Sequence, residues 1–489
     1  MKLFLLFSLV FLAYAEVPDC SNGIIKVDHT KTRVVFPSDG NLQIFPDNYV
    51  CQLQIPVPFG CFASLKIDVN SANPGKNAPV QVIDQTNQTE NVFHAESEQF
   101  YLISKGGSIN LSTGDSKTQF RVIINWEQYP PTSPFNYHNI QTTNMFDLYF
   151  DTPIVYSQSD AEIVTYIAHT TDSKALQDLR GLIFFNGPDC NSTILGTGRQ
   201  LLDRKTQFVT SASYNHYLTV LFLGKDGSTN TRFMIGLYET TKDFVELQTV
   251  IYPETWTGQL SMDASNGKSL IQTWAQGFQG HSMTHGVLNI TGTGNLEVYA
   301  NQSLPNLANP IVFYDASNTM NQLPQQLYGD GSYYLLTGGK STITLSNVHT
   351  LLEKTSDFGR TGYFASENFG TPDIEHYFQF GLTGVDSPTP TIFHLDFINV
   401  PFKKHDHLKI IVFVNGIQVS HRVYNRTNPL PGRSLEVSGD YCRVKYSSDF
   451  RAENNNGSLI HYKVTQNSKI GFSGVFSFIF VLLYLFAFH

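Results

Sequence analysis

The residues LKIDVNSANPGKNAPVQVID (Leu65–Asp84) and FYLISKGGSINLS (Phe100–Ser112) have a counterpart later in the same chain. The counterpart reads LEVYANQSLPNLANPIVFYD (Leu296–Asp315) and YYLLTGGKSTITLS (Tyr333–Ser346). Apolar residues alternate within each short block, as they do in a strand with one buried face. Segments rich in Asn, Pro and Gly separate the blocks and predict turns. We interpret the two stretches as equivalent strands of a repeated β unit.

Looser versions of this succession of short strands fill the rest of the chain. They are Ala161–His169, Gly181–Gly187, Tyr217–Gly224, Arg232–Glu239, His407–Ile417, Ser434–Asp449 and Ser458–Val464. No segment has a sustained 3.6-residue period, and Ser173–Leu182 is the best candidate for a short helix. The sequence therefore predicts an all-β fold of four similar antiparallel β-sandwiches of the jelly-roll kind in tandem. The alternative is that any all-β chain of this length shows strands at such spacing. The expected division is an N-terminal signal segment, four β-sandwich units and a C-terminal hydrophobic segment. Their ranges are 1–15, then 16–130, 131–245, 246–355 and 356–466, and finally 467–489.

The composition and charge of the chain bear on whether it binds nucleic acid. The chain has 489 residues, a formal net charge of −9 and only 15% charged residues. No run of Lys or Arg and no basic aromatic patch stands out along the sequence. A nucleic-acid-binding protein needs such a concentration of positive charge, so nucleic acid is not predicted as a partner.

The first residues have the pattern of a secretory signal peptide. Lys2 precedes the apolar run Leu3–Leu12, and Ala13-Tyr14-Ala15 offers small residues for cleavage. Export to an oxidising, glycosylating compartment agrees with the Asn-x-Ser/Thr sequons along the chain. These sequons predict N-glycosylation at Asn87, Asn110, Asn191, Asn289, Asn301, Asn425 and Asn456. Asn110 lies in a predicted strand and would have to face water.

The last residues predict a lipid anchor. Ile470–Phe488 is almost wholly apolar and is followed only by His489. This length barely suffices for a spanning helix, and Lys or Arg to hold a cytoplasmic end is missing. A terminal apolar run after small residues is the pattern of a GPI-attachment signal. Asn456 is one candidate attachment residue, but cleavage there would remove a predicted strand, so Asn467 is preferred.

The cysteines are odd in number. There are five, namely Cys20, Cys51, Cys61, Cys190 and Cys442. In an oxidising compartment they should pair where geometry allows, which leaves at least one free. A bond between Cys190 and Cys442 would require two different units to touch.

The first unit resembles a known family. The residues that carry the resemblance are CSNGIIKV (Cys20–Val27), PDNYVCQLQIPVPFGCFASLKIDV (Pro46–Val69), FYLISKGGSINLS and FRVIINW (Phe120–Trp126). Together they are similar to the nematode CUB-like domain family, over about residues 16–126. The resemblance implies a two-sheet β-sandwich, a disulfide between Cys20 and Cys51, and an association with the innate immune response and membrane rafts. Cys61 departs from the family pattern and is expected to be the lone thiol.

Candidate catalytic and metal-binding residues are few. GHSMT (Gly280–Thr284) lacks the last glycine of a G-x-S-x-G nucleophile elbow, so Ser282 is a weak nucleophile candidate. His281 and His285 have the spacing of zinc ligands on a helix but lack the helix and the adjacent Glu, and are interpreted as loop residues. His405 and His407 could share a strand face. No catalytic residue, metal site or cofactor is predicted from them, and the acidic ligands of a calcium site beside Ser448-Asp449 or Asp115 cannot be recognised.

These observations predict a non-catalytic recognition protein. We expect it on the outer side of the plasma membrane, held by the lipid anchor in membrane rafts, or secreted. Its partner would be a microbial product or another surface protein, with a protein or glycan ligand bound at the loops and exposed sheet faces of the sandwiches. The alternatives are a secreted hydrolase that uses Ser282 or the His405/His407 pair, and a structural component of a glycocalyx or matrix.

Overall fold

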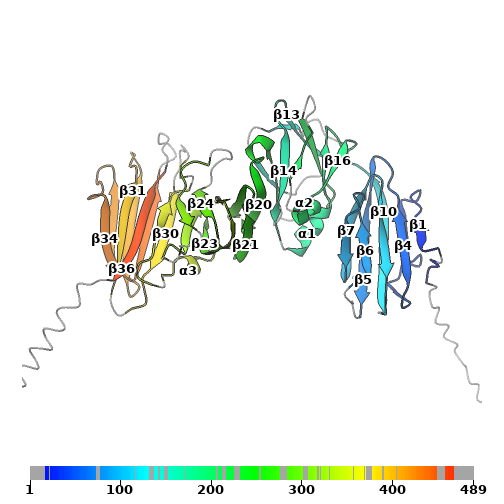
Figure 1. The fold of residues 1–489 in the computed structure, drawn as a ribbon, viewed down its shortest axis with the longest axis horizontal. Helices are drawn as coiled ribbons and strands as arrows, with labels where there is room; N and C mark the ends of the chain where they lie inside the picture. The colour runs from blue at the N-terminus through cyan, green and yellow to red at the C-terminus, as the bar shows by residue number, and fades with distance from the viewer. Residues whose placement is uncertain are drawn as a thin grey trace, which may run out of the picture.

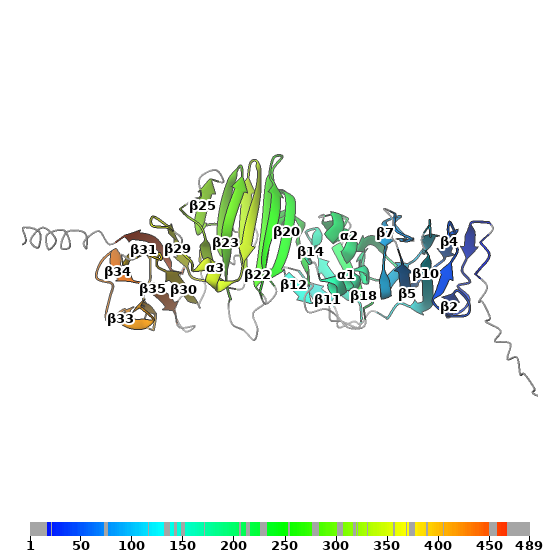
Figure 2. The same ribbon diagram turned by 90° about the horizontal axis from the view of Figure 1, so that it is seen from below.

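The computed structural model of the chain describes residues 17–466, apart from short internal gaps. The gaps are residues 21, 73–76, 116, 132–136, 141–143, 148–151, 171, 205–206, 212–215, 225–231, 253–254, 276–282, 301–306, 316–318, 320, 330, 356, 368, 371–376, 388–389, 404 and 449–456. Nearly every regular element in the described residues is a β-strand, and the strands form face-to-face sheets arranged in a row (Figures 1 and 2). The prediction of an all-β chain of sandwiches is therefore confirmed.

Unit 1, which comprises strands β1 to β10, is a sandwich of two sheets. The first sheet has the order β1 (Ile24–Lys26), β4 (Val50–Ile55), β9 (Gly107–Ser112), β6 (Val80–Ile83), β7 (Thr89–Val92). The second has the order β2 (Arg33–Phe36), β10 (Thr118–Gln128), β5 (Cys61–Ser71), β8 (Ala95–Ile103), with β3 (Gln43–Phe45) also on β10. Buried and partly exposed residues alternate along β10, so its apolar side faces the core between the sheets.

Unit 2 contains two sheets and two helices. One sheet has the order β11 (Tyr137–Asn139), β13 (Ile154–Gln158), β18 (His216–Phe222), β15 (Leu182–Asn186), β16 (Thr193–Thr197). The other contains β12 (Asn144–Asp147), β19 (Arg232–Leu237), β14 (Ile163–His169) and the short β17 (Phe208–Val209). The helices are α1 (Ser173–Arg180) and α2 (Gly198–Arg204), and a 3-10 turn, Tyr238–Thr240, follows β19. The helix expected at Ser173–Leu182 is present up to Arg180, whereas α2 was not predicted.

Unit 3 continues one of the sheets of unit 2. The strands β20 (Phe244–Tyr252), β22 (Lys268–Ala275), β27 (Gly331–Thr337), β24 (Asn295–Ala300) and β25 (Val312–Asp315) extend it. The link is a parallel pairing of β14 with β20, in which Ala168 faces Thr249 and His169 faces Val250. The opposing sheet has the order β21 (Thr257–Asp263), β28 (Lys340–Ser346), β23 (Met283–Gly292), β26 (Gln325–Gly329), and the short helix α3 (His349–Leu352) follows.

Unit 4 is a sandwich of two four-stranded sheets. One has the order β29 (Thr361–Ala365), β36 (Leu459–Gln466), β31 (Thr391–Asn399), β34 (Ser434–Gly439). The other has the order β30 (Tyr377–Thr383), β35 (Tyr441–Ser447), β32 (His407–Val414), β33 (Ile417–Asn425). Strands of units 1 and 4 lie at opposite ends of the row (Figure 1).

The repeat inferred from the sequence holds for three of its four blocks. In both units the first and third blocks pair antiparallel, β5 with β8 and β24 with β27. The fourth block, β9 or β28, then crosses to the opposing sheet. The second block differs, because β6 pairs with β9 whereas β25 pairs with β24. Alternation of apolar residues indicates which face of a strand is buried but does not determine its neighbour, so this difference could not be predicted.

The turn between the third and fourth blocks requires one glycine at the same place in both units. Lys105 and Gly106 have φ of 81° and 78°, and Gly338 and Gly339 have φ of 69° and 71°. A Cβ on Gly106 would lie 2.0 Å from the Ile55 carbonyl oxygen, and one on Gly339 would lie 2.4 Å from Thr293 Oγ1. Only glycine fits these positions, so the turn that sends the chain to the other sheet requires it.

The units pack against one another rather than hanging as separate beads. The shared sheet joins units 2 and 3, and hydrogen-bonded side chains join units 1 and 2 and units 3 and 4. The division at 130/131, 245/246 and 355/356 stays a prediction, and its second boundary lies inside β20.

A disulfide joins the N-terminal segment of unit 1 to β4. Cys20 and Cys51 are bonded with a Cα–Cα distance of 5.8 Å, which confirms the pairing implied by the resemblance. Cys61 is free as expected, but it is not the lone thiol, because Cys190 and Cys442 are free as well. Cys442 lies fully buried in the core of unit 4, and Cys190 is buried in unit 2, so the two do not pair.

Replacing Cys51 by Ala is expected to destabilise unit 1 by about 2–5 kcal/mol, because the unfolded chain loses its cross-link. Native-state hydrogen exchange of peptides from β4 and β9, followed as a function of urea, measures the loss. Cys61→Ala is the control, since it removes a thiol without breaking a bond. Equal losses in the two variants would contradict a stabilising role for the disulfide.

Candidate functional site: the groove beside helix α1

Helix α1 stands at the junction of units 1 and 2. The Asp172 carboxylate caps its N-terminus by accepting a hydrogen bond from the Ala175 N–H at 2.7 Å. Ala175 and Leu179 are buried, and Leu179 packs in the core of unit 2. The helix contacts β8 of unit 1, so its partly exposed side chains stand beside the sheet of the neighbouring unit.

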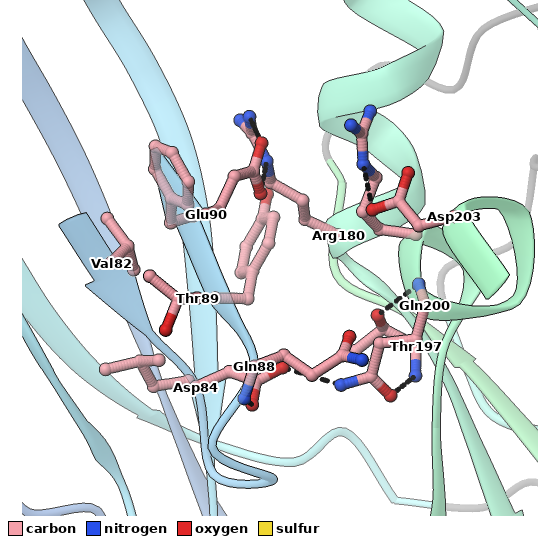
Figure 3. A pocket seen from close by; sticks show the side chains of 13 residues that line it. Val82, Asp84, Gln88, Thr89, Glu90, Arg180, Thr197, Gln200 and Asp203 are labelled. Atoms are coloured by element: carbon pink, nitrogen blue, oxygen red, sulfur yellow. Dashed lines mark hydrogen bonds and ion pairs between the residues drawn. The ribbon is translucent and has the colours of Figure 1, made fainter. Parts of the chain in front are cut away.

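Arg180, in the last turn of α1, reaches from unit 2 into unit 1. Its Nε donates to Glu90 Oε2 at 2.9 Å, its Nη2 donates to Glu98 Oε1 at 2.8 Å, and its Nη1 donates to the Gln99 carbonyl at 3.1 Å. Figure 3 shows the guanidinium group against Glu90, and its carbon lies 3.8 Å from the centre of the Phe100 ring. Burial lowers the pKa of Arg180, but the hydrogen bonds and charges of Glu90 and Glu98 outweigh burial and raise it. The side chain stays charged and ties the two units together.

Gln200 of α2 makes a second polar contact between the units. Its Nε2 donates to Asp84 Oδ2 at 2.6 Å (Figure 3). It also donates to Thr86 Oγ1 at 2.7 Å. Its Oε1 accepts the Thr197 N–H at 3.1 Å, which fixes the amide. A cavity of about 80 Å³ remains between the two polar contacts. Organic ligands occupy about 300–1,000 Å³, so this cavity is part of the joint and not a ligand site.

A larger groove of about 480 Å³ opens on the other side of α1. Its floor is the outer face of the sheet of β2, β10, β5 and β8, with polar side chains from Arg33, Ser64, Lys66, Gln99 and Asn125. Its wall is the side of α1 that carries Lys174, Gln177 and Asp178. Charged groups of both signs, planar amides and a hydroxyl therefore converge on one concave surface.

Tyr101 lies where the floor of the groove meets its wall. Burial, with smaller effects of the Asp178 and Glu127 charges, raises the pKa of Tyr101 to about 12. The phenol thus stays protonated at neutral pH and can donate a hydrogen bond. A Cβ on Gly181 would lie 2.9 Å from the Tyr101 ring, so the absence of a side chain at this position leaves room for the ring. A half-buried aromatic ring beside amides and charges is suited to hold a polar ligand such as a sugar.

An apolar cluster closes the junction behind the groove. Phe62 and Ile103 of unit 1 pack with Ile183, Phe185 and Leu221 of unit 2, and Cys190 joins them. Burial raises the pKa of Cys190 to about 12, so its thiol is not a nucleophile at neutral pH. Cys61 packs instead against the interior core of unit 1, because successive residues of β5 point to opposite faces.

The structure does not assemble the catalytic or metal candidates of the sequence into a site. Ser282 and His281 lie outside the described residues. His285 is not a loop residue as interpreted: it lies in β23, fully buried, with its Nε2 2.9 Å from Ser332 Oγ. Within the described part of the chain, no group of three or more His, Cys, Asp or Glu residues is arranged to hold a metal ion.

The three side chains of the His405-Asp406-His407 segment lie in different environments. His405 is exposed before β32, whereas His407 lies on β32 with its Nε2 3.1 Å from Ser447 Oγ. Asp406 is buried, and its Oδ2 accepts hydrogen bonds from the Lys403 N–H at 2.9 Å and the Tyr446 hydroxyl at 3.2 Å. The aspartate therefore holds the loop before β32 against the core.

The sequon asparagines differ in exposure. Asn87, Asn191 and Asn289 are exposed, whereas Asn110 and Asn425 are half-buried. Asn110 Oδ1 accepts a hydrogen bond from Gln52 Nε2 at 3.0 Å on the face of its sheet. The others, Asn301 and Asn456, lie outside the described residues, as do the proposed signal peptide, Asn467 and the apolar tail. Among the helices that the structure does describe, none is long and apolar enough to cross a membrane.

Comparison with protein families bears on unit 1 first. Residues 15–130 match the family model of the CUB-like domain. The chain carries a CUB-like domain. This match indicates a binding or recognition module. Two further models match, each described only as a domain of unknown function: DUF7592 over residues 140–223 and DUF7591 over residues 239–348.

The chain is also similar to solved structures. The match with the CUB1-EGF-CUB2 domain of human MASP-1/3 covers 43% of this chain and 99% of that one, at 11% identity and a TM-score of 0.16. It matches the corresponding domains of rat MASP-1 at 10% identity, over 44% of this chain and 100% of that one, with a TM-score of 0.15. A cycloalternan-forming enzyme from Listeria monocytogenes matches at 9% identity, over 43% of this chain and 19% of that one, with a TM-score of 0.14. None of these likenesses carries a functional argument, and no curated protein matches the chain.

Sequence reasoning missed the residues of this junction. Arg180 is separated from Glu90 by 90 positions and from Glu98 by 82, and no local motif links it to them. A signal was available only for α1 itself, through the helix candidate at Ser173–Leu182. Its basic C-terminal residue looked like an ordinary helix terminus.

Replacing Arg180 by Ala is expected to loosen units 1 and 2 and to destabilise their contact by about 3 kcal/mol, because Glu90 and Glu98 would lose their partner. Small-angle scattering should show a broader distribution of interunit distances, and limited proteolysis should cut the residue 129–140 connection faster. Arg199→Ala, which removes only the pair with Asp203, is the control, and its effect should stay within about 0.5 kcal/mol. Identical scattering of the Arg180 variant and the parent protein would contradict the interlock.

Proposed function

We propose that this protein is a non-catalytic recognition protein of the innate immune response. In this proposal it resides on the outer side of the plasma membrane, in membrane rafts, or is secreted. Its ligand is a microbial glycan held in the groove beside α1. The resemblance of unit 1 to nematode CUB-like proteins supports the defence role, and the CUB-like match supports recognition. The groove is the single observation that carries the choice of site.

The size and chemistry of the groove support a saccharide ligand. Its volume of about 480 Å³ falls within the range of about 300–1,000 Å³ for ligand sites. Sugars present hydroxyl groups that pair with planar amides and carboxylates, and apolar faces that pack on aromatic rings. Gln99, Asn125 and Gln177 supply the amides, and Tyr101 supplies the ring. Arg180 and Gln200 fix the position of the wall relative to the floor, so the site needs little rearrangement on binding.

Two other functions remain alternatives with less support. A secreted hydrolase using Ser282 or the His405/His407 pair is disfavoured because His407 bonds to Ser447 and Asp406 is engaged in holding a loop. A structural glycocalyx or matrix protein would have no discrete ligand, and the groove argues for one. Expression that rises on bacterial challenge would favour defence over structure.

Replacing Lys66 and Gln177 by Ala together is expected to weaken glycan binding at least tenfold, because one residue is removed from the floor and one from the wall of the groove. A microbial glycan array probed with the ectodomain identifies the saccharide, and calorimetry with the strongest binder measures the change. The matched control is Lys26→Ala with Gln54→Ala. These residues are register partners on the opposite sheet of unit 1 and should leave binding unchanged.

Capture of a protein rather than a saccharide, sensitive to the same groove substitutions, would replace the glycan in this proposal with a surface protein. Equal binding by the groove variant and the control variant would overturn the site.

Attachment through a glycolipid at Asn467 is part of the same proposal. Phosphatidylinositol-specific phospholipase C is expected to release the protein from intact cells, because the apolar tail would have been exchanged for the lipid. Truncation before Ile470 should send the protein into the medium. Retention after phospholipase treatment, together with tail peptides from Val475–Phe488 in the mature chain, would replace the lipid with a spanning helix.

A further inference from the structure

The outer face of one sheet of unit 4 collects basic side chains from three strands. Along β35 and β32, buried residues alternate with partly exposed ones, so Lys445 and Lys409 both point outward. These two lysines are register partners, directly opposite each other on neighbouring strands. The adjacent row contains Arg443 on β35 and His421 on β33, with Ile411 between them.

Rings border this cationic strip on both sides. On one side Lys445 Nζ lies 5.1 Å from the centre of the Tyr377 ring. On the other side the Arg443 guanidinium lies 5.6 Å from the Phe413 ring and 5.7 Å from the Tyr441 ring. The strip is therefore two residues wide, crosses the strands, and is flanked by aromatic side chains.

The charge of the strip is not compensated by the neighbouring groups that the structure describes. Among the described residues, no ion pair involves Lys409, Lys445 or Arg443. One carboxylate, Glu353, lies at the β30 edge, where the Tyr441 hydroxyl donates to it at 3.4 Å. Like charges directly opposite on a sheet are destabilising, so a bound anion would stabilise the Lys409–Lys445 pair. In a chain of net charge −9, the strip is a local exception.

We propose that this strip, formed by Lys409, Lys445, Arg443 and His421, binds a sulfated polysaccharide. Sulfate groups would neutralise the charges of the two opposed lysines. They would also pair with Arg443, whose guanidinium group can bind an anion in a bidentate manner. The flanking rings would pack on the faces of the sugar units. A narrow strip bordered by aromatic rings on both sides suits a single linear chain better than the plane of a membrane. The proposal is independent of the groove beside α1, which lies in units 1 and 2.

Heparin is the probe, and the full chain is used in detergent. Replacing Lys409 and Lys445 together by Gln is expected to lower heparin affinity at least tenfold at physiological salt. The salt dependence should become shallower by about two released counterions, by analogy with other polyanions. The melting temperature should not fall, because the substitution removes a repulsive pair. A merely structural role for the lysines would give the opposite stability result.

Lys463→Gln is the matched control, since this exposed lysine lies on the outer face of the other sheet of unit 4. It should leave heparin binding unchanged, as should the groove variant with Lys66 and Gln177 replaced. Equal loss of binding in the Lys463 variant, or unchanged binding in the double variant, would overturn the proposal. So would tighter binding to anionic phospholipid vesicles or to DNA than to heparin through the same residues.

Discussion

The buried guanidinium group of Arg180 fixes how the first half of the molecule is assembled. A cation removed from water is costly unless it is paired and hydrogen-bonded, and Arg180 meets this condition only with groups of unit 1: Glu90, Glu98 and the Gln99 carbonyl. The two units must therefore meet in one orientation, in which α1 stands beside β8 (Figure 3). The groove beside α1 exists because of this orientation, since its floor and its wall belong to different units.

The other two junctions use backbone groups in place of a pair of opposite charges. Units 2 and 3 share a sheet through the pairing of β14 with β20. Between units 3 and 4, Arg360 is buried and donates to the carbonyl oxygens of Pro324, Leu352 and Lys354 at 2.7, 3.0 and 2.7 Å. Gln326 adds a bond from its Nε2 to the Gly381 carbonyl at 2.6 Å. Together the three junctions turn four sandwiches into one extended row (Figure 2).

The two candidate binding surfaces lie in different parts of the row, the groove at the junction of units 1 and 2 and the strip on unit 4 (Figure 1). The groove beside α1 presents amides, an aromatic ring and charges of both signs, which suits a saccharide of mixed polarity. The strip on unit 4 presents cations between aromatic rings, which suits a polyanion. A rigid row would hold the first surface away from the second, so a protein retained by a polyanionic layer could still present its groove outward.

Alternation of apolar residues along the chain was sufficient to predict an all-β fold, because a strand with one buried face imposes a period of two on its sequence. The glycine-containing segments of the repeat were correctly predicted to be turns, and the turn between the sheets excludes any Cβ at Gly106 and Gly339. The family resemblance gave the disulfide between Cys20 and Cys51. These features depend on local backbone geometry or on a covalent bond within one unit.

Only the tertiary structure decided the neighbours of each strand, the packing of the units and both candidate surfaces. The sequence shows no run of Lys or Arg, yet Lys409, Arg443, Lys445 and His421 lie together because three strands place alternate residues on one face. Arg180 looks like the end of an ordinary helix until Glu90 and Glu98 lie against it. The physical reason is the same in both cases: charges interact through space, and the distance between them is set by strand register and unit packing, which a one-dimensional pattern does not contain.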